Sequence, residues 1–337
     1  MKRSYIRAFC AALLVSSGSA EEGGRAIRIG IIGLDTGHST EFTRIINMDA
    51  GKPEYAAKLK GLKVVAAYPA GSKDIPESVN RVPGYTEEIR KMGVEIVGSV
   101  DELVTKVDAV LLESNDGKVH LEQIRPVLKA KKPVFVDKPV AASLADCIRI
   151  FNEAEAAGTP LFSSSALRFG KATQQVREGK IGKVSHVEAH SPAHLEKSHP
   201  DLFWYGIHGV EPLFTVLGKG AIRVKRTKTA DGLIEVSGEW SGGRRGIFRE
   251  SNQTDRKGYG GAAKGESGEL AMGSFDGYEP LVLAVADFFR TGKPPVSAEE
   301  TLEIYAFMEA ADESKRRGGE VVTLQETMDK AKAKIAR

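Results

Sequence analysis

A strand, a loop and the start of a helix near the beginning of the chain form a segment suited to phosphate binding. The apolar run 27–33 reads as a strand, and Leu34-Asp35-Thr36-Gly37-His38-Ser39 follows it directly. A glycine at the end of such a strand permits a sharp turn, and the N-terminus of the next helix attracts an anion. We therefore expect the diphosphate of a nucleotide to rest on the helix start, with Thr36 among its contacts.

This loop departs from the glycine-rich sequence that usually performs the role. Of the three glycines in the pattern GxGxxG only the first is present, as Gly33, while Asp35 and His38 stand at the other two positions. A carboxylate at the second position repels a diphosphate by like charge. Asp35 can instead be a residue of the helix N-terminus stabilised by the helix dipole, or it can bind a different ligand. These interpretations stay open, and Gly33, Asp35 and His38 are kept as predicted cofactor contacts.

Two further residues have side chains suited to acid–base chemistry. Lys138 follows the predicted buried strand 134–137 and precedes Pro139, which ends the hydrogen bonding of the strand, so a structural role for the ammonium group is not favoured. His208 lies in an apolar helical stretch, with Glu211 one turn later. An imidazole accepts a proton near neutral pH, and an ammonium group stabilises developing negative charge. On its surroundings alone, however, His208 is better explained as a core residue.

The elements that must position these residues alternate between strand and helix in the first half of the chain. Short apolar runs separated by helical patterns are typical of a parallel sheet with crossover helices. The predicted strands are 27–32, 63–68, 94–97, 109–113, 134–137 and 161–164, and the predicted helices are 40–48, 101–106, 121–131 and 144–157. The segment 69–90 is polar and irregular, and we expect a long loop there.

The second half of the chain has a different pattern of apolar and polar residues. Alternation with a period of two predicts strands at 183–190, 222–229, 233–239, 246–250 and 268–274, and a short helix is expected at 171–178. Helices at 202–217, 279–290 and 298–315 are expected to cover one face of this sheet. The glycine-rich segment 259–267 reads as a turn or mobile loop.

The predicted fold class follows from the patterns of the two halves of the chain. It is α/β, with a Rossmann-type doubly wound parallel sheet in residues 25–150, followed in residues 151–337 by an α+β domain with an open, mostly antiparallel sheet.

Together these motifs resemble the Gfo/Idh/MocA family, which includes glucose-fructose oxidoreductase and inositol dehydrogenases. The resemblance extends over about residues 25–322 and rests on Lys138-Pro139 after the fifth strand, on the segment 116–120 after the fourth, and on the helix that contains His208. The family has Glu-Lys-Pro where this chain has Asp137-Lys138-Pro139, so Asp137 is a mild departure.

The resemblance implies an NAD(P)-dependent oxidoreductase that acts on a secondary alcohol of a sugar, cyclitol or polyol. In the family the lysine lies beside the nicotinamide and the substrate hydroxyl, and a helix pattern Asp-x-x-x-His-x-x-Asp supplies the general base. Matched onto this chain, Lys138 and His208 are retained, Glu211 replaces the second Asp, and Trp204 replaces the first. Lys138, His208 and Glu211 are therefore the catalytic residues that the resemblance implies.

The cofactor is expected to be NAD or NADP. Members that bind NAD usually carry an acidic residue at the end of the second strand, where this chain has Ser72 and Lys73, which suit the 2′-phosphate of NADP. Alternatively, no nucleotide binds there. The further cofactor contacts that the resemblance implies are Ser72, Asn115, His120, Asp137 and Lys138.

Residues 1–20 have the composition of a cleavable secretory signal. Lys2, Arg3 and Arg7 precede an apolar stretch at 8–15, which is too short to span a bilayer, and small residues follow as far as Ala20. We expect export to the periplasm or the extracellular space, by the Sec or the twin-arginine route, without stable membrane insertion. The three basic residues equal the whole net charge of +3, so the exported chain is neutral, which argues against nucleic acid as a partner.

Neither cysteine pairing nor a metal is predicted. Cys10 lies in the signal, so Cys147 is the single cysteine of the exported chain and forms no intrachain disulfide. His186, Glu188 and His190 share one strand face and have metal-ligating side chains, but a solvated surface explains them more simply. A homo-oligomer is expected from the resemblance alone.

Two alternatives to the oxidoreductase stay open. One is a glycoside lyase or hydrolase that uses a bound nicotinamide only transiently. The other is a non-redox carbohydrate-binding scaffold whose nucleotide site has degenerated, for which Asp35 and His38 are the sequence evidence.

Overall fold

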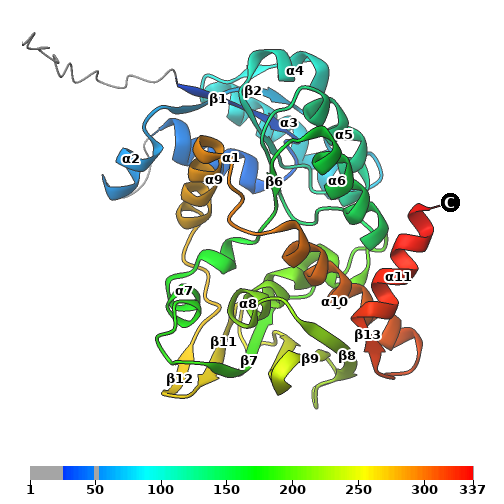
Figure 1. The fold of residues 1–337 in the computed structure, drawn as a ribbon. Helices are drawn as coiled ribbons and strands as arrows, with labels where there is room; N and C mark the ends of the chain where they lie inside the picture. Colours follow the sequence, from blue (N-terminus) through cyan, green and yellow to red (C-terminus); the bar gives the residue numbers. More distant parts are fainter. Residues whose placement is uncertain (1–25, 49–52, 337) are drawn as a thin grey trace, which may run out of the picture.

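The first part of the chain folds around a parallel sheet. The computed structural model describes residues 26–48 and 53–336 (Figure 1). Six parallel strands stand in the order β3-β2-β1-β4-β5-β6. Successive strands are added on one side of β1 as far as β3 and on its other side from β4 onward, so the strand order reverses between β1 and β4. The strands are β1 (Ile27–Ile32), β2 (Leu62–Tyr68), β3 (Glu95–Ile96), β4 (Ala109–Leu112), β5 (Val134–Val136) and β6 (Leu161–Phe162). This confirms the predicted Rossmann-type sheet, and a reversal of this kind is where ligands bind in such folds.

Crossover helices cover both faces of this sheet (Figure 1). They are α1 (Gly37–Asn47), α2 (Pro53–Leu59), α3 (Pro76–Lys91), α4 (Val100–Lys106), α5 (Gly117–Lys129) and α6 (Leu144–Ala157). Several begin at a polar side chain that accepts a backbone N–H, as Ser99 does for α4, Asp116 for α5 and Ser143 for α6. These caps satisfy amide groups that a helix start leaves without partners.

Helix α3 overturns the prediction of a long irregular loop at 69–90. The loop ends at Ile75, and Pro76 occupies the first helical turn, where a missing N–H costs nothing. Pro83 lies inside the helix. Tertiary packing outweighs this local penalty, because Ile89 and Ser78 are both fully buried against the sheet side of the domain.

The second domain contains a seven-stranded sheet in the order β12-β11-β7-β10-β9-β8-β13. Its strands are β7 (Val184–Ser191), β8 (Ala221–Lys228), β9 (Ile234–Trp240), β10 (Arg245–Glu250), β11 (Gly260–Gly265), β12 (Gly268–Ala271) and β13 (Val322–Thr323). Only β10 and β7 pair in parallel; the other neighbours are antiparallel. The mostly antiparallel sheet is therefore confirmed. Helices α8 (Ile207–Leu217) and α10 (Ala298–Arg316) pack on one face, and Figure 1 shows no helix of the described residues over the other face.

Most of the glycine-rich segment 259–267 is strand β11 (Gly260–Gly265), contrary to the prediction of a turn or mobile loop, and a turn follows at 266–267. Strand β11 pairs with β7 and β12. A Cβ atom at Gly261, whose φ is +155°, would lie 2.1 Å from the carbonyl oxygen of Glu188. The glycines therefore allow two backbones to approach closely, and this requirement produces the same sequence pattern as a flexible loop.

Helix α9 (Glu279–Thr291) also differs from expectation. It was predicted to cover the second sheet, but Figure 1 shows it beside α1 and α2 of the first domain. Its apolar residues Leu281, Val285 and Phe288 join the same buried cluster as Ile29 of β1 and Phe42 of α1. The parallel sheet itself continues to Phe162 in β6, beyond the domain boundary predicted at residue 150.

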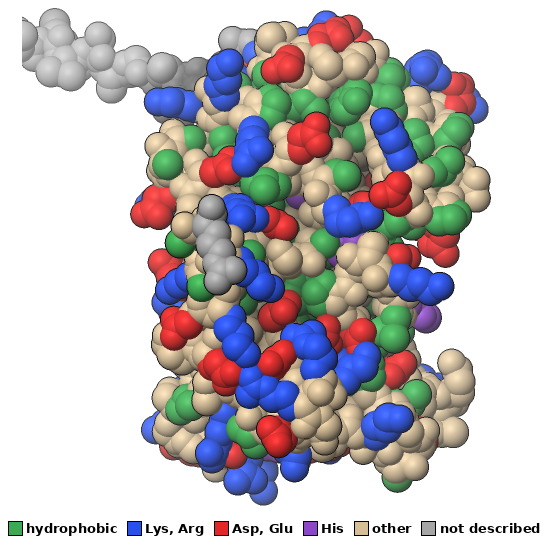
Figure 2. Space-filling model, turned by 90° about the vertical axis from the view of Figure 1, so that its right-hand side faces the viewer, with side chains coloured by type: hydrophobic (Ala, Val, Ile, Leu, Met, Phe, Trp, Pro, Cys, Tyr) green, Lys and Arg blue, Asp and Glu red, His purple; other side chains and the backbone are tan. Residues whose placement is uncertain are grey.

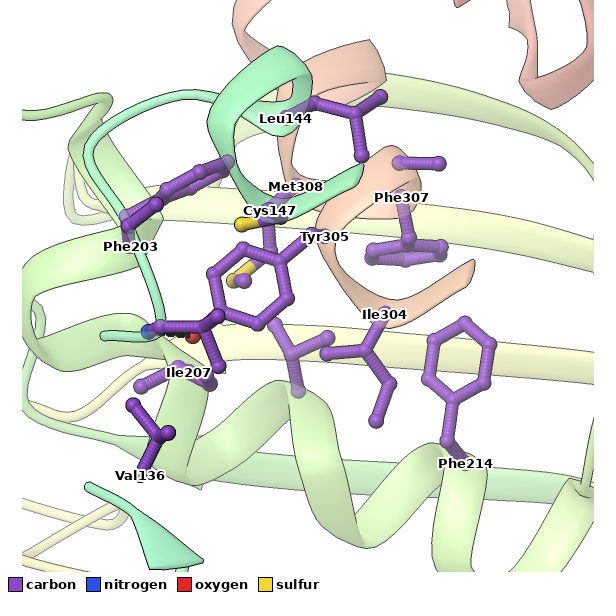
Figure 3. Close-up of a cluster of buried hydrophobic side chains, with 14 of the residues drawn as sticks. Val136, Leu144, Cys147, Phe203, Ile207, Phe214, Ile304, Tyr305, Phe307 and Met308 are labelled. Carbon is purple, nitrogen blue, oxygen red and sulfur yellow. Dashed lines mark hydrogen bonds between the residues drawn. The ribbon is translucent and has the colours of Figure 1, made fainter. Parts of the chain in front are cut away.

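The two domains share a continuous core (Figure 3). Tyr305 of α10 is fully buried, lies with its ring centroid 4.8 Å from that of Phe203, and accepts a hydrogen bond of 2.7 Å from the backbone N–H of Val140. Cys147 of α6 is buried in the same cluster, and burial raises the pKa of its thiol well above the ordinary value. Domain two therefore directly supports the segment that follows β5.

The surface carries charges of both signs. Figure 2 shows Lys and Arg interspersed with Asp and Glu over one whole face. Within residues 26–48 and 53–336, no helix combines the length and the hydropathy that crossing a bilayer requires. The predicted secretory signal lies outside the described residues.

We expect Tyr305→Phe to destabilise the protein by about 1–3 kcal/mol, because the buried N–H of Val140 loses its acceptor while the ring packing is kept. Denaturant unfolding measures the change. Tyr55→Phe is the matched control, since the hydroxyl of the half-buried Tyr55 has no hydrogen-bond partner among the described residues. Equal stabilities of the two variants would contradict this role of Tyr305.

Candidate functional site

A cavity of about 880 Å³ lies between the two domains. From the first domain it is lined by the start of α1, by Pro76, Glu77 and Arg81 of α3, and by Asp137 and Lys138. From the second domain come His208 and a group of aromatic side chains, Trp204, Tyr205, Tyr259, Phe275 and Tyr278. A helix N-terminus, titratable groups and an aromatic wall therefore face one space.

Gly33 makes the loop between β1 and α1 possible. Its φ is +97°, and a Cβ atom there would lie 2.3 Å from the backbone nitrogen of Ser114. Thr36 caps α1 by accepting the N–H of His38 at 3.0 Å, and residues 36–38 line the cavity. The retained glycine thus brings the start of α1 to the cavity, where the helix dipole favours an anion.

Asp35 turns away from the cavity into the protein. It is fully buried; its Oδ1 accepts the N–H of Asn115 at 2.9 Å, and its Oδ2 accepts the hydroxyl of Ser78 at 2.6 Å. Ser78 in turn accepts the N–H of Ser72 at 2.7 Å. Burial raises the pKa of Asp35, and these hydrogen bonds offset part of the rise. The carboxylate joins three loops and leaves the helix start accessible.

Lys138 and His208 come together as the sequence predicted. Lys138 joins Pro139 through a cis peptide bond and lies with Nζ 5.8 Å from the ring centroid of Tyr205. His208 Nδ1 lies 2.7 Å from the hydroxyl oxygen of Ser165. Burial, together with the charge of Lys138, lowers the pKa of His208 well below 6.5. His208 is therefore neutral near pH 7 and can accept a proton.

Ser165 orients the imidazole of His208, a role for which this chain lacks the first aspartate of the family's helix pattern. Trp204 stands where the family has an aspartate, and the hydroxyl of Ser165 contacts the imidazole instead. Trp204 and Tyr205 lie in the π-helical turn η2 (Leu202–Gly206), which widens the start of the helix and directs both side chains to the cavity. Ser165 follows β6 at a distance of 43 residues from His208, so spacing gave no signal for it.

Glu211 lies behind the cavity and does not line it. Its carboxylate accepts the N–H of Ser165 at 2.6 Å, a hydrogen bond from Arg168 Nε at 2.7 Å, and the hydroxyl of Ser164. Burial raises the pKa of Glu211, and Arg168 counteracts the rise. The structure thus gives Glu211 a positioning role, because it holds the residue that contacts His208.

The other predicted cofactor contacts divide into two groups. Asn115 and Asp137 line the cavity. Ser72 and His120 are buried outside it: Ser72 accepts the N–H of Asp74, while the two ring nitrogens of His120 lie 2.7 Å from Ser114 O and 3.1 Å from Val140 O. Ser72 and His120 therefore shape the loops around the cavity.

Sequence reasoning missed Glu113, which is fully buried at the end of β4. Burial, reinforced by the neighbouring charge of Asp137, raises the pKa of Glu113 well above its ordinary value. Asp137 Oδ2 lies 2.7 Å from His38 Nδ1. Burial alone would raise the pKa of Asp137, but His38 and Lys138 lower it. The sequence signal for Glu113 was a carboxylate placed directly after an apolar strand.

Two of the three residues weighed as a metal site on β7, His186 and Glu188, are engaged with each other. Glu188 lies 3.0 Å from His186 Nε2 and pairs with Arg249. Glu188 is therefore held in ion pairs with His186 and Arg249.

A family model covers the first of the two domains. Residues 27–164 match the Gfo/Idh/MocA model, described as the oxidoreductase family with an NAD-binding Rossmann fold. The first domain is therefore similar to the NAD-binding Rossmann domain of that family. The cavity opens at the carboxyl edge of its sheet, which is where this type of domain receives its ligand.

Individual relatives agree with this assignment over part of the chain. Inositol 2-dehydrogenase 3 of Saccharopolyspora erythraea is 26% identical over 183 residues, 51% of this chain and 48% of that protein. The 2,7-anhydro-N-acetylneuraminate hydratase of Escherichia coli is 31% identical over 94 residues, 26% of this chain and 25% of that protein. The chain thus spans about half or less of the curated relatives it matches.

The solved structures show the same fold for nearly the whole chain. Scyllo-inositol dehydrogenase from Lactobacillus casei, solved with NAD(H) and scyllo-inositol, superposes with a TM-score of 0.68 and 18% identity. The match covers 89% of this chain and 100% of that one. The second domain therefore shares its fold with that of known dehydrogenases.

His199, beneath the cavity wall, gives a testable pH dependence. Its Nε2 accepts the N–H of Gly117 at 3.1 Å, and burial lowers the pKa of the imidazole to about 4. The folded state thus binds fewer protons than the unfolded state between pH 6.5 and 4. The contribution of His199 to the free energy of unfolding is therefore complete above pH 6.5 and is lost as the pH falls towards 4. We expect His199→Gln to lessen the loss of unfolding free energy between pH 7 and pH 4.5.

Denaturant titrations at the two pH values measure this difference. His194→Gln, which removes an exposed imidazole, is the control. The same slope of stability against pH in His199→Gln and in the wild-type protein would contradict the role of His199.

Proposed function

We propose that the protein is an NAD(P)-dependent oxidoreductase acting on a secondary alcohol of a sugar, cyclitol or polyol. The observation that carries this proposal is that Lys138 and His208 face the same cavity that begins at the N-terminus of α1. The cofactor fits this arrangement: residues 36–38 and Arg81 are suited to the diphosphate, and Lys138 lines the same cavity.

The residues of this chain supply the acid–base chemistry. When bound, a nicotinamide accepts a hydride from the alcohol carbon. Because His208 Nδ1 contacts Ser165, its Nε2 is the atom that takes the hydroxyl proton, and the low pKa of His208 keeps it unprotonated beforehand. The ammonium group of Lys138 stabilises the negative charge that develops on the substrate oxygen.

The walls of the cavity favour a ring-shaped polyol as substrate. Tyr205, Tyr259, Phe275 and Tyr278 present aromatic rings, with Tyr205 and Tyr259 joined through their hydroxyl groups at 2.8 Å. Aromatic rings combine an apolar face with a polar tip, which suits the alternating C–H and hydroxyl groups of a sugar or cyclitol. The relatives named inositol dehydrogenase support this choice.

We expect Lys138→Met and His208→Gln each to lower kcat about 10²- to 10⁴-fold, because one removes charge stabilisation and the other the general base. Nicotinamide absorbance during incubation with a panel of cyclitols and sugars measures the rate. Lys225→Met and His186→Gln, on exposed strands of the second sheet, are the matched controls. Undiminished turnover in the cavity variants would refute these roles.

Cofactor binding is tested separately from turnover. Calorimetry with NAD and NADP, together with mass spectrometry of small molecules released on denaturation, should detect a nucleotide held by the wild-type protein. A protein that neither retains nor binds either nucleotide is not an oxidoreductase of this type.

A second candidate is a lyase or hydratase that uses the nicotinamide without net redox change. The relative from Escherichia coli that is named a hydratase favours it. A product assay without added nucleotide separates the two, because turnover with no net cofactor reduction supports this candidate.

We also propose that the protein is exported, on the strength of the signal-like residues 1–20. Fractionation of cells expressing the full chain should place the processed form outside the cytoplasm. An unprocessed cytoplasmic protein would refute export. The face of the second sheet that lies opposite α8 and α10 is the surface we propose for homo-oligomer formation.

A further inference from the structure

Three metal-ligating side chains converge at adjacent strand ends beside the cavity. His38 belongs to the first turn of α1, Glu113 follows β4 and Asp137 follows β5. One ligand atom of each lies within 4.8 Å of those of the other two. Strands β1, β4 and β5 are neighbours in the parallel sheet, so the fold itself brings the three residues together.

Two of the three carboxyl groups near this point lack the partners that burial demands. Glu113 is fully buried, and neither of its carboxyl oxygens has a hydrogen-bond partner among the described residues. Oδ1 of Asp137, a residue only 1% exposed, is likewise without one. A buried carboxylate without a hydrogen bond or a counter-charge is strongly unfavourable. Asp35 is satisfied by Ser78 and Asn115 and does not supply the missing groups.

We propose that His38, Glu113 and Asp137 bind one divalent transition-metal cation at the wall of the cavity. An imidazole and two carboxylates are ligands suited to Zn²⁺ and Mn²⁺, and the two negative charges balance the charge of the ion. Ligand atoms about 2.1 Å from a tetrahedral zinc ion lie about 3.4 Å apart, so atoms up to 4.8 Å apart reach one ion when each side chain moves by less than about 1 Å.

The surroundings of His38 hold the ring in a suitable orientation. Its Nε2 lies 3.1 Å from the hydroxyl of Tyr278, and its ring stacks on Phe42 with centroids 5.5 Å apart. When Nε2–H donates to Tyr278, Nδ1 carries the lone pair, and Nδ1 is the atom that faces Asp137. A tyrosine hydroxyl can both donate and accept a hydrogen bond. Tyr278 can therefore donate to Nε2 of His38 when no metal is bound and accept from Nε2–H when Nδ1 binds the metal.

His38 and Asp137 line the cavity, whereas Glu113 lies deeper, so the ion is reached from the cavity side. Lys138 is the nearest cation and stays outside the ligand set. The proposal goes beyond the oxidoreductase activity and does not depend on it, because a metal is measured without nucleotide or substrate.

The test uses untagged protein purified from cells that express the full chain. After dialysis against EDTA, we expect isothermal calorimetry with Mn²⁺ or Zn²⁺ to show one site per chain. Glu113→Gln should weaken binding at least about tenfold, because it replaces an anionic ligand by an amide of the same shape. Asp137→Asn should do the same. The absorption spectrum of the Co²⁺ form should report nitrogen and oxygen ligands in the wild-type protein only.

Glu41→Gln, a partly exposed residue of α1 paired with Arg44, is the matched control and should bind the metal like the wild-type protein. Absence of binding in the wild-type protein, or equal affinity in Glu113→Gln, would overturn the proposal and leave Glu113 and Asp137 as buried carboxyl groups that bind no metal. Metal binding with no nucleotide binding would refute the proposed oxidoreductase while supporting the metal site.

Discussion

The hydrogen bonds of the buried Asp35 carboxylate are the constraint around which the first domain is arranged. The group accepts from Asn115 after β4 and from Ser78 at the start of α3, and Ser78 holds the loop after β2. In the usual nucleotide fold a glycine at this position lets the diphosphate approach the backbone. Here the side chain faces inward, so three loops are joined without placing negative charge in the cavity.

This arrangement has a consequence for the chemistry of the cavity. Because the Asp35 side chain satisfies the loops from within, the first turn of α1 stays on the cavity wall, where His38 meets Asp137. Buried carboxyl groups differ in their hydrogen bonding here. Both oxygens of Asp35 accept hydrogen bonds, whereas neither oxygen of Glu113 has a partner among the described residues. The contrast separates a structural carboxylate from one that is positioned for a ligand.

Much of the architecture was predictable because it rests on local patterns. Alternation of apolar runs and helical segments identified all six parallel strands, and strand periodicity identified β7 to β10. The predictions failed where tertiary contacts decided the outcome. The polar segment 69–90, predicted as a long loop, contains helix α3 because Ile89 packs in the core, and Gly261 of β11 serves the close approach to Glu188. Helix α9 was found, but its amphipathic pattern does not say which sheet it covers.

The site was predictable only in part, for a similar reason. Lys138 and His208 follow from motifs, and the structure places both on the cavity. Glu211 and His120 carry the expected residue types, but their side chains hold backbone segments in place. Ser165 and Glu113 escaped notice because their importance depends on neighbours distant in sequence. Ser165 is meaningful only beside His208, and Glu113 only beside Asp137.

The placement of α9 on the first domain bears on how the protein is made. Leu281, Val285 and Phe288 complete a core whose other members belong to β1 and α1. The Rossmann unit therefore cannot finish folding when residue 164 leaves the ribosome, since part of its interior is encoded more than 100 residues later. Until Arg290 has been synthesised, the early half of the chain exposes an apolar surface that a chaperone or rapid completion of synthesis must protect.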